Sequence, residues 1–265
     1  MKVIAFQYHD IINPGQFNAS GFPGSGPASY KIEKDEFEQQ MAMLSRILAI
    51  NPVTVPEVIA SSVRSDVVLL TFDDGGISAF SPILDILDKY GWKAHFFITT
   101  NYIGTPTFLT KEHIRSLRRN GHIVGSHSCS HPQRMSCQSW DDLLREWTTS
   151  LKCLSDILGE EVTTASVPHG YYSRKVAKTA ALSGVKALFT SEPVRDTHNV
   201  GNCAVFGRYV IRPGIHHNLI AQLVRGRNWA WGKEYLFWNA KKIAKVVGGQ
   251  AYLKLRDQVL HQSSR

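Results

Sequence analysis

The hydrophobic residues of this chain alternate between short continuous runs and stripes with helical spacing. Residues 67–70 form a continuous apolar run of valine and leucine, which is typical of a strand buried on both faces. Residues 37–48 instead carry an apolar side chain at every third or fourth position, which predicts an amphipathic helix. The stripe of that helix consists of Phe37, Met41, Leu44 and Leu48.

Capping residues place further helices between the strand-like runs. Ser81-Pro82 predicts a helix start, with the serine as N-cap and the proline as the first helical residue. Thr110 and Gly121 bracket a second helix, Gly159 ends a long third one, and residues 173–183 continue the pattern. Repeated β-then-α units imply an α/β fold with mainly parallel strands, and we find no internal sequence repeat.

Length and composition agree with one large folded domain. At 265 residues and 43% hydrophobic content, the chain is long enough to form a single α/β barrel. The four cysteines show no paired spacing and the sequence opens directly with a strand-like run, so we expect reduced thiols and a cytoplasmic location. No apolar run approaches the ~20 residues that are needed to span a bilayer.

A pair of adjacent carboxylates follows the apolar run at residues 67–70. Asp73 and Asp74 lie in the sequence Thr-Phe-Asp-Asp-Gly-Gly, and on an extended backbone such neighbours face opposite ways. The two glycines permit a turn that brings both carboxylates into one pocket. Active sites of parallel α/β folds gather at the carboxyl ends of strands. Alone, however, the motif is equally typical of an ordinary turn.

Two histidines follow another strand-like run at residues 121–126. His127 and His131 are separated by three residues, and the proline after His131 biases it away from helical geometry, which predicts a loop. Such a pair is weak by itself in a chain with 11 histidines. Together with Asp74, it would supply three ligands and leave one position for water, as in a catalytic zinc site. Asp73 would then be free to act as the base.

The two motifs, in this order, resemble those of the polysaccharide deacetylase family (NodB-type, carbohydrate esterase family 4). The family motifs T-F-D-D-G and H-[ST]-x-x-H match residues 71–75 and 127–131, and the resemblance extends to about residue 215. It implies a distorted, incomplete (β/α) barrel, Asp73 as catalytic base and one divalent metal ion. We expect zinc, while nickel, cobalt or iron stay open because the ligands do not choose among them. The implied metal ligands are Asp74, His127 and His131.

The third motif of the family departs from its usual form in this chain. R-x-P-Y-G corresponds here to residues 166–170, so Ser166 replaces the arginine that orients the base carboxylate in the family. The family's tyrosine supplies a backbone N–H to the tetrahedral oxyanion, and His169 can keep that role because any non-proline residue has this donor. The implied oxyanion turn is Pro168, His169 and Gly170. The fourth motif, with an Asp-Trp pair, has no clear counterpart.

The general acid has two candidate positions. In the family it comes from a Leu-x-His near the C-terminus, where His216 and His217 lie in roughly the right place but follow a glycine and precede a helical pattern. The N-terminal run ends instead in Tyr8-His9, which resembles a branch of the family that acts on exported poly-N-acetylglucosamine. In that branch the N-terminal histidine is the acid, so we favour His9. A histidine that merely ends a strand is the alternative.

A long loop is expected directly after His9. Residues 13–29 contain glycines and prolines in a stretch that either covers the substrate or is a plain surface excursion. The glycines alone do not decide between these two interpretations.

Most of the positive charge lies near the C-terminus. Residues 225–265 hold nine lysines or arginines and two acidic residues, which is +7 of the formal net charge of +8. With three tryptophans, this segment predicts a basic, aromatic-rich helical extension packed on or next to a catalytic domain of residues 1–224. Such helices can lie on anionic membranes; alternatively, the aromatic side chains pack on the barrel. No recognised motif accompanies the charge, so we expect no nucleic-acid partner.

These features predict a metal-dependent carbohydrate N-deacetylase that removes an N-acetyl or N-formyl group from an amino sugar. In the cytoplasm its substrate would be a nucleotide-linked or polyprenyl-diphosphate-linked intermediate of surface polysaccharide biosynthesis, and both carriers contain phosphate. The alternatives are a metal-dependent amidase acting on a non-sugar C–N bond and a catalytically silent carbohydrate-binding relative. Retention of Asp73 argues against the silent relative, because binding alone does not need a base.

Overall fold

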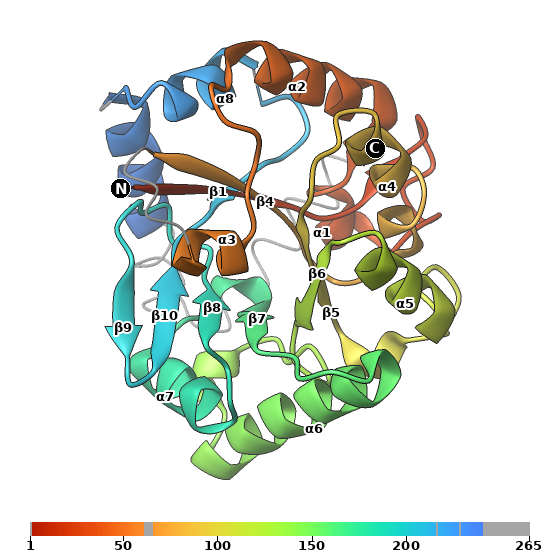
Figure 1. Cartoon of the computed structure of the whole chain (residues 1–265), viewed down its shortest axis with the longest axis vertical. Helices are drawn as coiled ribbons and strands as arrows, with labels where there is room; N and C mark the ends of the chain where they lie inside the picture. The colour runs from red at the N-terminus through yellow and green to blue at the C-terminus, as the bar shows by residue number, and fades with distance from the viewer. Residues whose placement is uncertain (1, 61–65, 216, 228, 241–265) are drawn as a thin grey trace.

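A curled sheet surrounded by helices forms the body of the protein (Figure 1). The computed structural model describes residues 2–60, 66–215, 217–227 and 229–240. The strands of the main sheet are β1 (Val3–Tyr8), β4 (Val67–Phe72), β5 (His95–Ile98), β6 (Ile123–Ser126), β7 (Thr164–Ser166), β8 (Ala187–Phe189), β9 (His198–Val200), β10 (Cys203–Phe206) and β11 (Tyr209–Val210). The helices are α1 (Ser25–Ala28), α2 (Lys34–Ile47), α3 (Val55–Ala60), α4 (Ile83–Asp88), α5 (Lys111–Arg119), α6 (Trp140–Leu158), α7 (Arg174–Leu182) and α8 (His217–Val224).

The sheet is an incomplete barrel. Its strand order is β11-β1-β4-β5-β6-β7-β8-β10-β9, and every neighbouring pair is parallel except β10 with β9. Within the described ranges, the two outer strands β11 and β9 do not pair with each other, so the barrel stays open between them. The predicted distorted, incomplete (β/α) barrel with mainly parallel strands is therefore confirmed. Two short strands, β2 (Ile11–Ile12) and β3 (Ile32–Glu33), pair separately.

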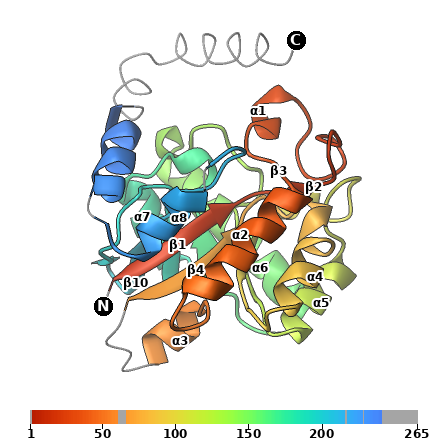
Figure 2. The ribbon, with the colours of Figure 1, turned by 90° about the horizontal axis from the view of Figure 1, so that it is seen from above.

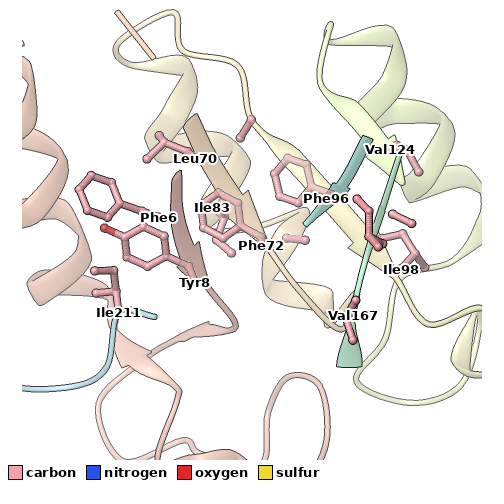
Figure 3. Packing of buried hydrophobic residues seen from close by; sticks show 14 of the residues in the cluster. Phe6, Tyr8, Leu70, Phe72, Ile83, Phe96, Ile98, Val124, Val167 and Ile211 are labelled. Carbon is pink, nitrogen blue, oxygen red and sulfur yellow. The ribbon is translucent and has the colours of Figure 1, made fainter. Parts of the chain in front are cut away.

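Alternation along the strands separates an outer core from an inner face. In β1, Phe6 and Tyr8 belong to the larger hydrophobic cluster under the helices, whereas Ala5 belongs to a second, smaller cluster. In Figure 3 the outward rings of Tyr8, Phe72 and Phe96 lie in one row, and Phe72 stacks on Phe96 with centroids 5.1 Å apart. Both faces of these strands are buried, as expected for a parallel sheet covered by helices.

The inner face is apolar at the amino ends of the strands and polar at their carboxyl ends. Helix α3 contributes Val55 and Val58 to the inner cluster, and the buried His95 accepts a hydrogen bond from the Val55 N–H at 3.0 Å through Nε2. Further along the same face, Gln7 and Asp73 replace apolar residues and bond to each other. The barrel is thus closed at one end by hydrophobic packing and carries its polar groups at the other.

Most predicted helices are confirmed. Thr110 caps α5 and Ser173 caps α7, each through its side chain, and α6 ends at Gly159 with φ of 72°. The predicted start at Ser81-Pro82 is wrong by one residue, because Pro82 is the N-cap of α4 and Ser81 precedes the helix. The Ser81 hydroxyl instead donates to the Asp85 carboxylate at 2.7 Å.

Part of the predicted C-terminal extension can be described. Residues 229–240 are helical, and Trp231 is buried against Tyr209 with centroids 4.4 Å apart, whereas Trp229 is 60% exposed. One aromatic side chain therefore packs on the barrel and another faces outward. The rest of the extension, residues 241–265, lies outside the described residues. Within those residues, no helix has both the length and the apolarity that a membrane crossing requires.

Candidate metal centre and base

Asp74, His127 and His131 converge at the carboxyl ends of β4 and β6. The Asp74 Oδ1 atom lies 3.3 Å from Nε2 of His127 and 3.3 Å from Nε2 of His131. The three donor atoms all lie within 4.8 Å of one another, and Asp74 and His127 are buried. Burial alone would raise the pKa of Asp74, but the two imidazoles hold it well below its usual range. The sequence motifs therefore meet in space as predicted.

The donor set fits a divalent cation. Ligand bonds of 2.0–2.2 Å in a tetrahedral site place the ligand atoms about 3.3–3.6 Å apart, which matches the two O–N distances. His127 Nδ1 lies 2.5 Å from the Ser166 hydroxyl oxygen. If Nδ1 carries the proton and donates there, Nε2 keeps its lone pair directed toward Asp74. This second hydrogen bond is the kind that fixes metal-binding histidines in proteins.

The backbone around this cluster is held in unfavourable conformations. Asp74, Ser128, His131 and His169 have φ between 54° and 74°, the left-handed region that non-glycine residues rarely adopt. Such residues cost roughly 1–3 kcal/mol each and tend to gather at functional sites. The turn that redirects the chain after β4 thus begins at Asp74 itself and continues through Gly75, whose φ is 83°.

Glu146 of α6 fixes the loop between the two histidines. Its Oε2 accepts the backbone N–H groups of Cys129 and Ser130 at 2.9 and 2.8 Å, and its Oε1 accepts the Ser130 hydroxyl at 2.5 Å. The Cys129 Sγ atom lies instead 3.0 Å from Asn101 Oδ1, away from the donor set. Sequence reasoning did not find Glu146, because nothing in the helical pattern distinguishes it from an exposed acidic residue.

Arg208 holds the carboxylate of Asp73 in place of the family's motif arginine. Its Nη1 and Nη2 atoms donate to Oδ1 and Oδ2 at 2.7 and 2.8 Å, and both side chains are fully buried. Gln7 Nε2 donates to Oδ2 at 2.8 Å, and the Ser166 hydroxyl donates to Oδ1 at 3.2 Å. Burial raises the pKa of Asp73, but the Arg208 guanidinium and His127 outweigh it and lower this pKa.

The sequence contained no local signal for Arg208. It follows β10, and with Gly207 it forms the link from β10 to β11, which lie toward opposite ends of the strand order. A side chain on Gly207 would meet the Glu192 carbonyl oxygen at 2.4 Å, so the link must pack tightly there. The arginine reaches Asp73 across a separation of 135 residues, which no local pattern reveals.

His9 lies level with Asp73, because the residues that precede them, Tyr8 and Phe72, are paired in the parallel register of β1 and β4. It directly follows β1, and burial lowers its pKa while the charges of Asp74 and Asp73 act in the opposite direction. Within the described part of the chain, its Nδ1 atom is buried without a hydrogen-bond partner. The structure therefore places His9 at the cluster, whereas the alternative candidate His216 lies outside the described residues. His217 begins α8.

The third-motif turn borders the cluster on another side. Pro168–Gly170 forms a short 3-10 turn after β7, and the His169 ring lies 4.4 Å from the His131 ring between centroids. The left-handed φ of His169 turns the chain sharply at this point. The predicted oxyanion residues are thus brought to the same end of the barrel as the carboxylates.

The loop after β1 is anchored by a buried lysine. Lys31 Nζ donates to the carbonyl oxygens of Phe17, Ser20 and Phe22 at 2.7, 2.5 and 2.7 Å, and its side chain is 1% exposed. The Phe22 ring lies 4.8 Å from the His131 ring. Figure 2 shows the segment from β2 through α1 to β3 on the side toward which β1 points. Of the two interpretations of this loop, a cover beside the cluster agrees better with these contacts.

Comparisons with known proteins assign the family. A half-barrel of parallel strands with an Asp-His-His cluster at their carboxyl ends defines an α/β-barrel protein with a candidate metal centre. The family model described as Polysaccharide deacetylase matches residues 60–188. The chitooligosaccharide deacetylase of Sinorhizobium fredii is 30% identical over 165 residues, which cover 61% of this chain and 73% of that protein. The chain belongs to the polysaccharide deacetylase family.

Two further similarities extend over most of the chain. The putative polysaccharide deacetylase YxkH of Bacillus subtilis is 26% identical over 191 residues, covering 71% of this chain and 68% of that protein. The structure of the Streptococcus pyogenes deacetylase PplD in complex with acetate superposes with a TM-score of 0.69 at 22% identity. It covers 84% of this chain and 97% of PplD, which supports the fold. Two other relatives match over only 46% and 27% of their own lengths.

Proposed function

We propose that the protein is a divalent-metal-dependent hydrolase that removes an N-acetyl or N-formyl group from an amino sugar. The observation that carries this proposal is the convergence of Asp74, His127 and His131 beside a buried, arginine-held Asp73. Membership of the polysaccharide deacetylase family supports the reaction class, and the chitooligosaccharide deacetylase of Sinorhizobium fredii supports an amino-sugar substrate.

Asp74, His127 and His131 would hold the metal ion, for which zinc is our first choice. When bound there, a divalent cation supplies Lewis acidity and lowers the pKa of a water molecule toward 7. The protein's own contribution is to fix the ligands. His127 is oriented by its hydrogen bond to Ser166, and the backbone N–H groups of Cys129 and Ser130 are fixed by Glu146.

Asp73 would act as the base that accepts the proton of the attacking water. Its lowered pKa keeps it ionised near neutral pH, so the proton-accepting form is always present. Both oxygens are held by the guanidinium of Arg208, so the carboxylate cannot rotate away from the site. Arg208 is therefore a positioning residue for this base.

His9 would protonate the departing amine, as in the branch of the family with an N-terminal Tyr-His. Its Nδ1 atom has no partner in the described part of the chain. The backbone N–H of His169, in the Pro168–Gly170 turn, would stabilise the oxygen that becomes negatively charged when the amide carbon turns tetrahedral. The two groups border the cluster from different strands, so the amide of the substrate would lie between them.

The amino sugar is proposed to be a nucleotide-linked or polyprenyl-diphosphate-linked intermediate of surface polysaccharide biosynthesis in the cytoplasm. Four free cysteines agree with a reducing compartment. Residues 225–265 are proposed as an extension of a catalytic domain of residues 1–224 that touches anionic membrane surfaces. The exposed Leu236 and Phe237 and the basic composition of the segment support this contact.

Acetate release from N-acetylated sugars by metal-loaded protein tests the proposal. We expect release by the natural sequence and its loss in Asp73→Asn, with Asp85→Asn on the outer helix α4 as a control of unchanged activity. Sugar binding without release under any metal would favour the silent relative. Hydrolysis of cyclic imides without sugar deacetylation would favour the amidase. Either result would overturn the proposal.

A further inference from the structure

A half-buried arginine contacts Tyr30, whose ring lies next to the candidate acid His9, and it has no role in the reaction described above. Arg212 Cζ lies over the Tyr30 ring at 4.6 Å from its centroid, and its Nη2 atom donates to the Tyr30 hydroxyl at 3.2 Å. The Tyr30 ring in turn lies 5.0 Å from the His9 ring. The Tyr30 ring is therefore the only group needed to connect the Arg212 guanidinium with His9.

Strand register explains why Arg212 faces the inner side of the barrel. β11 pairs with β1 in parallel, with Gln7 opposite Val210, so residue 212 continues to the level of His9. Ile211 belongs to the outer hydrophobic cluster, and side chains alternate along an extended chain. Arg212 consequently lies on the same side as Gln7, which bonds to Asp73.

Among the described residues, no acidic side chain neutralises the charge of Arg212. No carboxylate in the described ranges lies within ion-pair distance of it, whereas Arg208 is neutralised by Asp73. Stacking on an aromatic ring leaves most guanidinium donors available, and an arginine can grip a phosphate through two parallel hydrogen bonds. The ring of Tyr30 is held by its neighbour, because Lys31 is anchored to three carbonyl oxygens of the preceding loop.

We propose that Arg212, supported by Tyr30, is a subsite for the phosphate attached to the anomeric carbon of the amino sugar. This inference rests on the proposed function. In such a sugar, the amide-bearing carbon is the direct neighbour of the anomeric carbon that carries the phosphate. A histidine that protonates the departing amine therefore has the phosphate close by. Arg212, one aromatic ring away from His9, would meet that negative charge and make the site select a phosphate-linked sugar over a neutral one.

The test compares kcat/KM for N-acetylglucosamine 1-phosphate and for neutral N-acetylglucosamine, using metal-loaded full-length protein. In Arg212→Gln, we expect the phosphate-to-neutral ratio to fall about tenfold to a hundredfold, the usual effect of losing a charged hydrogen bond. Arg212→Lys keeps the charge and should lose less. Arg145→Gln, an arginine that is 70% exposed on α6, is the matched control and should leave the ratio unchanged.

Several outcomes would overturn the subsite. These are an unchanged ratio in Arg212→Gln, an equal loss for both substrates, or a charge preference for the carboxylate of N-acetylmuramic acid instead of the phosphate. If the natural protein deacetylates none of the sugars, the proposed function fails, and calorimetric binding of glucosamine 1-phosphate then decides the subsite alone. A tenfold weaker binding in Arg212→Gln would support it, and equal binding would refute it.

Discussion

Replacing Arg208 by methionine tests how the buried carboxylate of Asp73 is held. The substitution removes the two hydrogen bonds of 2.7 and 2.8 Å to Asp73 and leaves a charge that is 0% exposed without its counter-ion. Removing one partner of a buried pair typically costs about 3–5 kcal/mol, mostly because the remaining charge has lost its hydration and its partner. We expect a fall of that size in the free energy of unfolding.

A double-mutant cycle isolates the cause. Asp73→Asn removes the charge but keeps the shape, so Arg208→Met should cost clearly less in the Asp73→Asn background than in the natural sequence. Urea unfolding at neutral pH, followed by tryptophan fluorescence, measures all four proteins. Arg118→Met provides the control, since its partner Glu160 is 44% exposed and such surface pairs contribute about 1 kcal/mol or less.

Additive effects in this cycle would show that Arg208 is not the main partner of the Asp73 charge. A loss of less than about 1 kcal/mol in the free energy of unfolding for Arg208→Met would lead to the same conclusion, because breaking a desolvated ion pair should cost more than that. In either case Asp73 would be held chiefly by Gln7 and Ser166, and the substitution in the third motif would need another explanation.

Three further predictions concern groups around the site. Glu146→Gln removes the charge that holds two backbone N–H groups between His127 and His131, so zinc affinity measured by calorimetry should fall about 10–100-fold, with Glu160→Gln unchanged. Burial lowers the pKa of His95 from 6.5 to about 4. Between these pH values the imidazole is protonated in the unfolded chain but not in the folded protein, so stability is lost as pH falls from 6.5 to 4. That loss, up to about 3 kcal/mol by urea unfolding, should shrink in His95→Gln, and an equal loss in both proteins would contradict it. Lys31→Met leaves the buried Asp10 without its counter-charge, so the free energy of unfolding should fall by about 3–5 kcal/mol. Proteolysis within residues 13–24 should become faster. Lys89→Met, whose side chain is 60% exposed, should change neither.

The sequence predicted the fold and the Asp-His-His cluster because both depend on local patterns. Continuous apolar runs, helix caps and two short motifs at strand ends each occupy a few consecutive residues, and parallel pairing brings the strand ends together. Asp74, His127 and His131 were found in this way. The helix start at Ser81-Pro82 was misplaced because the usual N-cap and proline order gave no sign that the proline itself is the cap.

What the sequence did not disclose depends on contacts between distant residues. Three charged residues look ordinary in the sequence, namely Arg208, Glu146 and Lys31. Their partners are far away along the chain or in an irregular loop, and only the folded structure brings them into contact. Ser166 illustrates the same limit. Its departure from the family motif left the support of Asp73 open, and the answer lay in a residue that follows β10.

The position of Arg208 shows how the family's site tolerates the loss of its motif arginine. A guanidinium needs only to reach both oxygens of Asp73, and the open side of an incomplete barrel offers a second route to them. Ser166 then has room to connect Asp73 with His127, which an arginine at that position would leave without a hydroxyl partner. The same link leads into β11 and on to Arg212, so one short segment carries both the arginine that holds Asp73 and the arginine proposed to bind phosphate. A change in the length of this link should therefore disturb both functions together, because the register of β11 against β1 sets where each arginine falls.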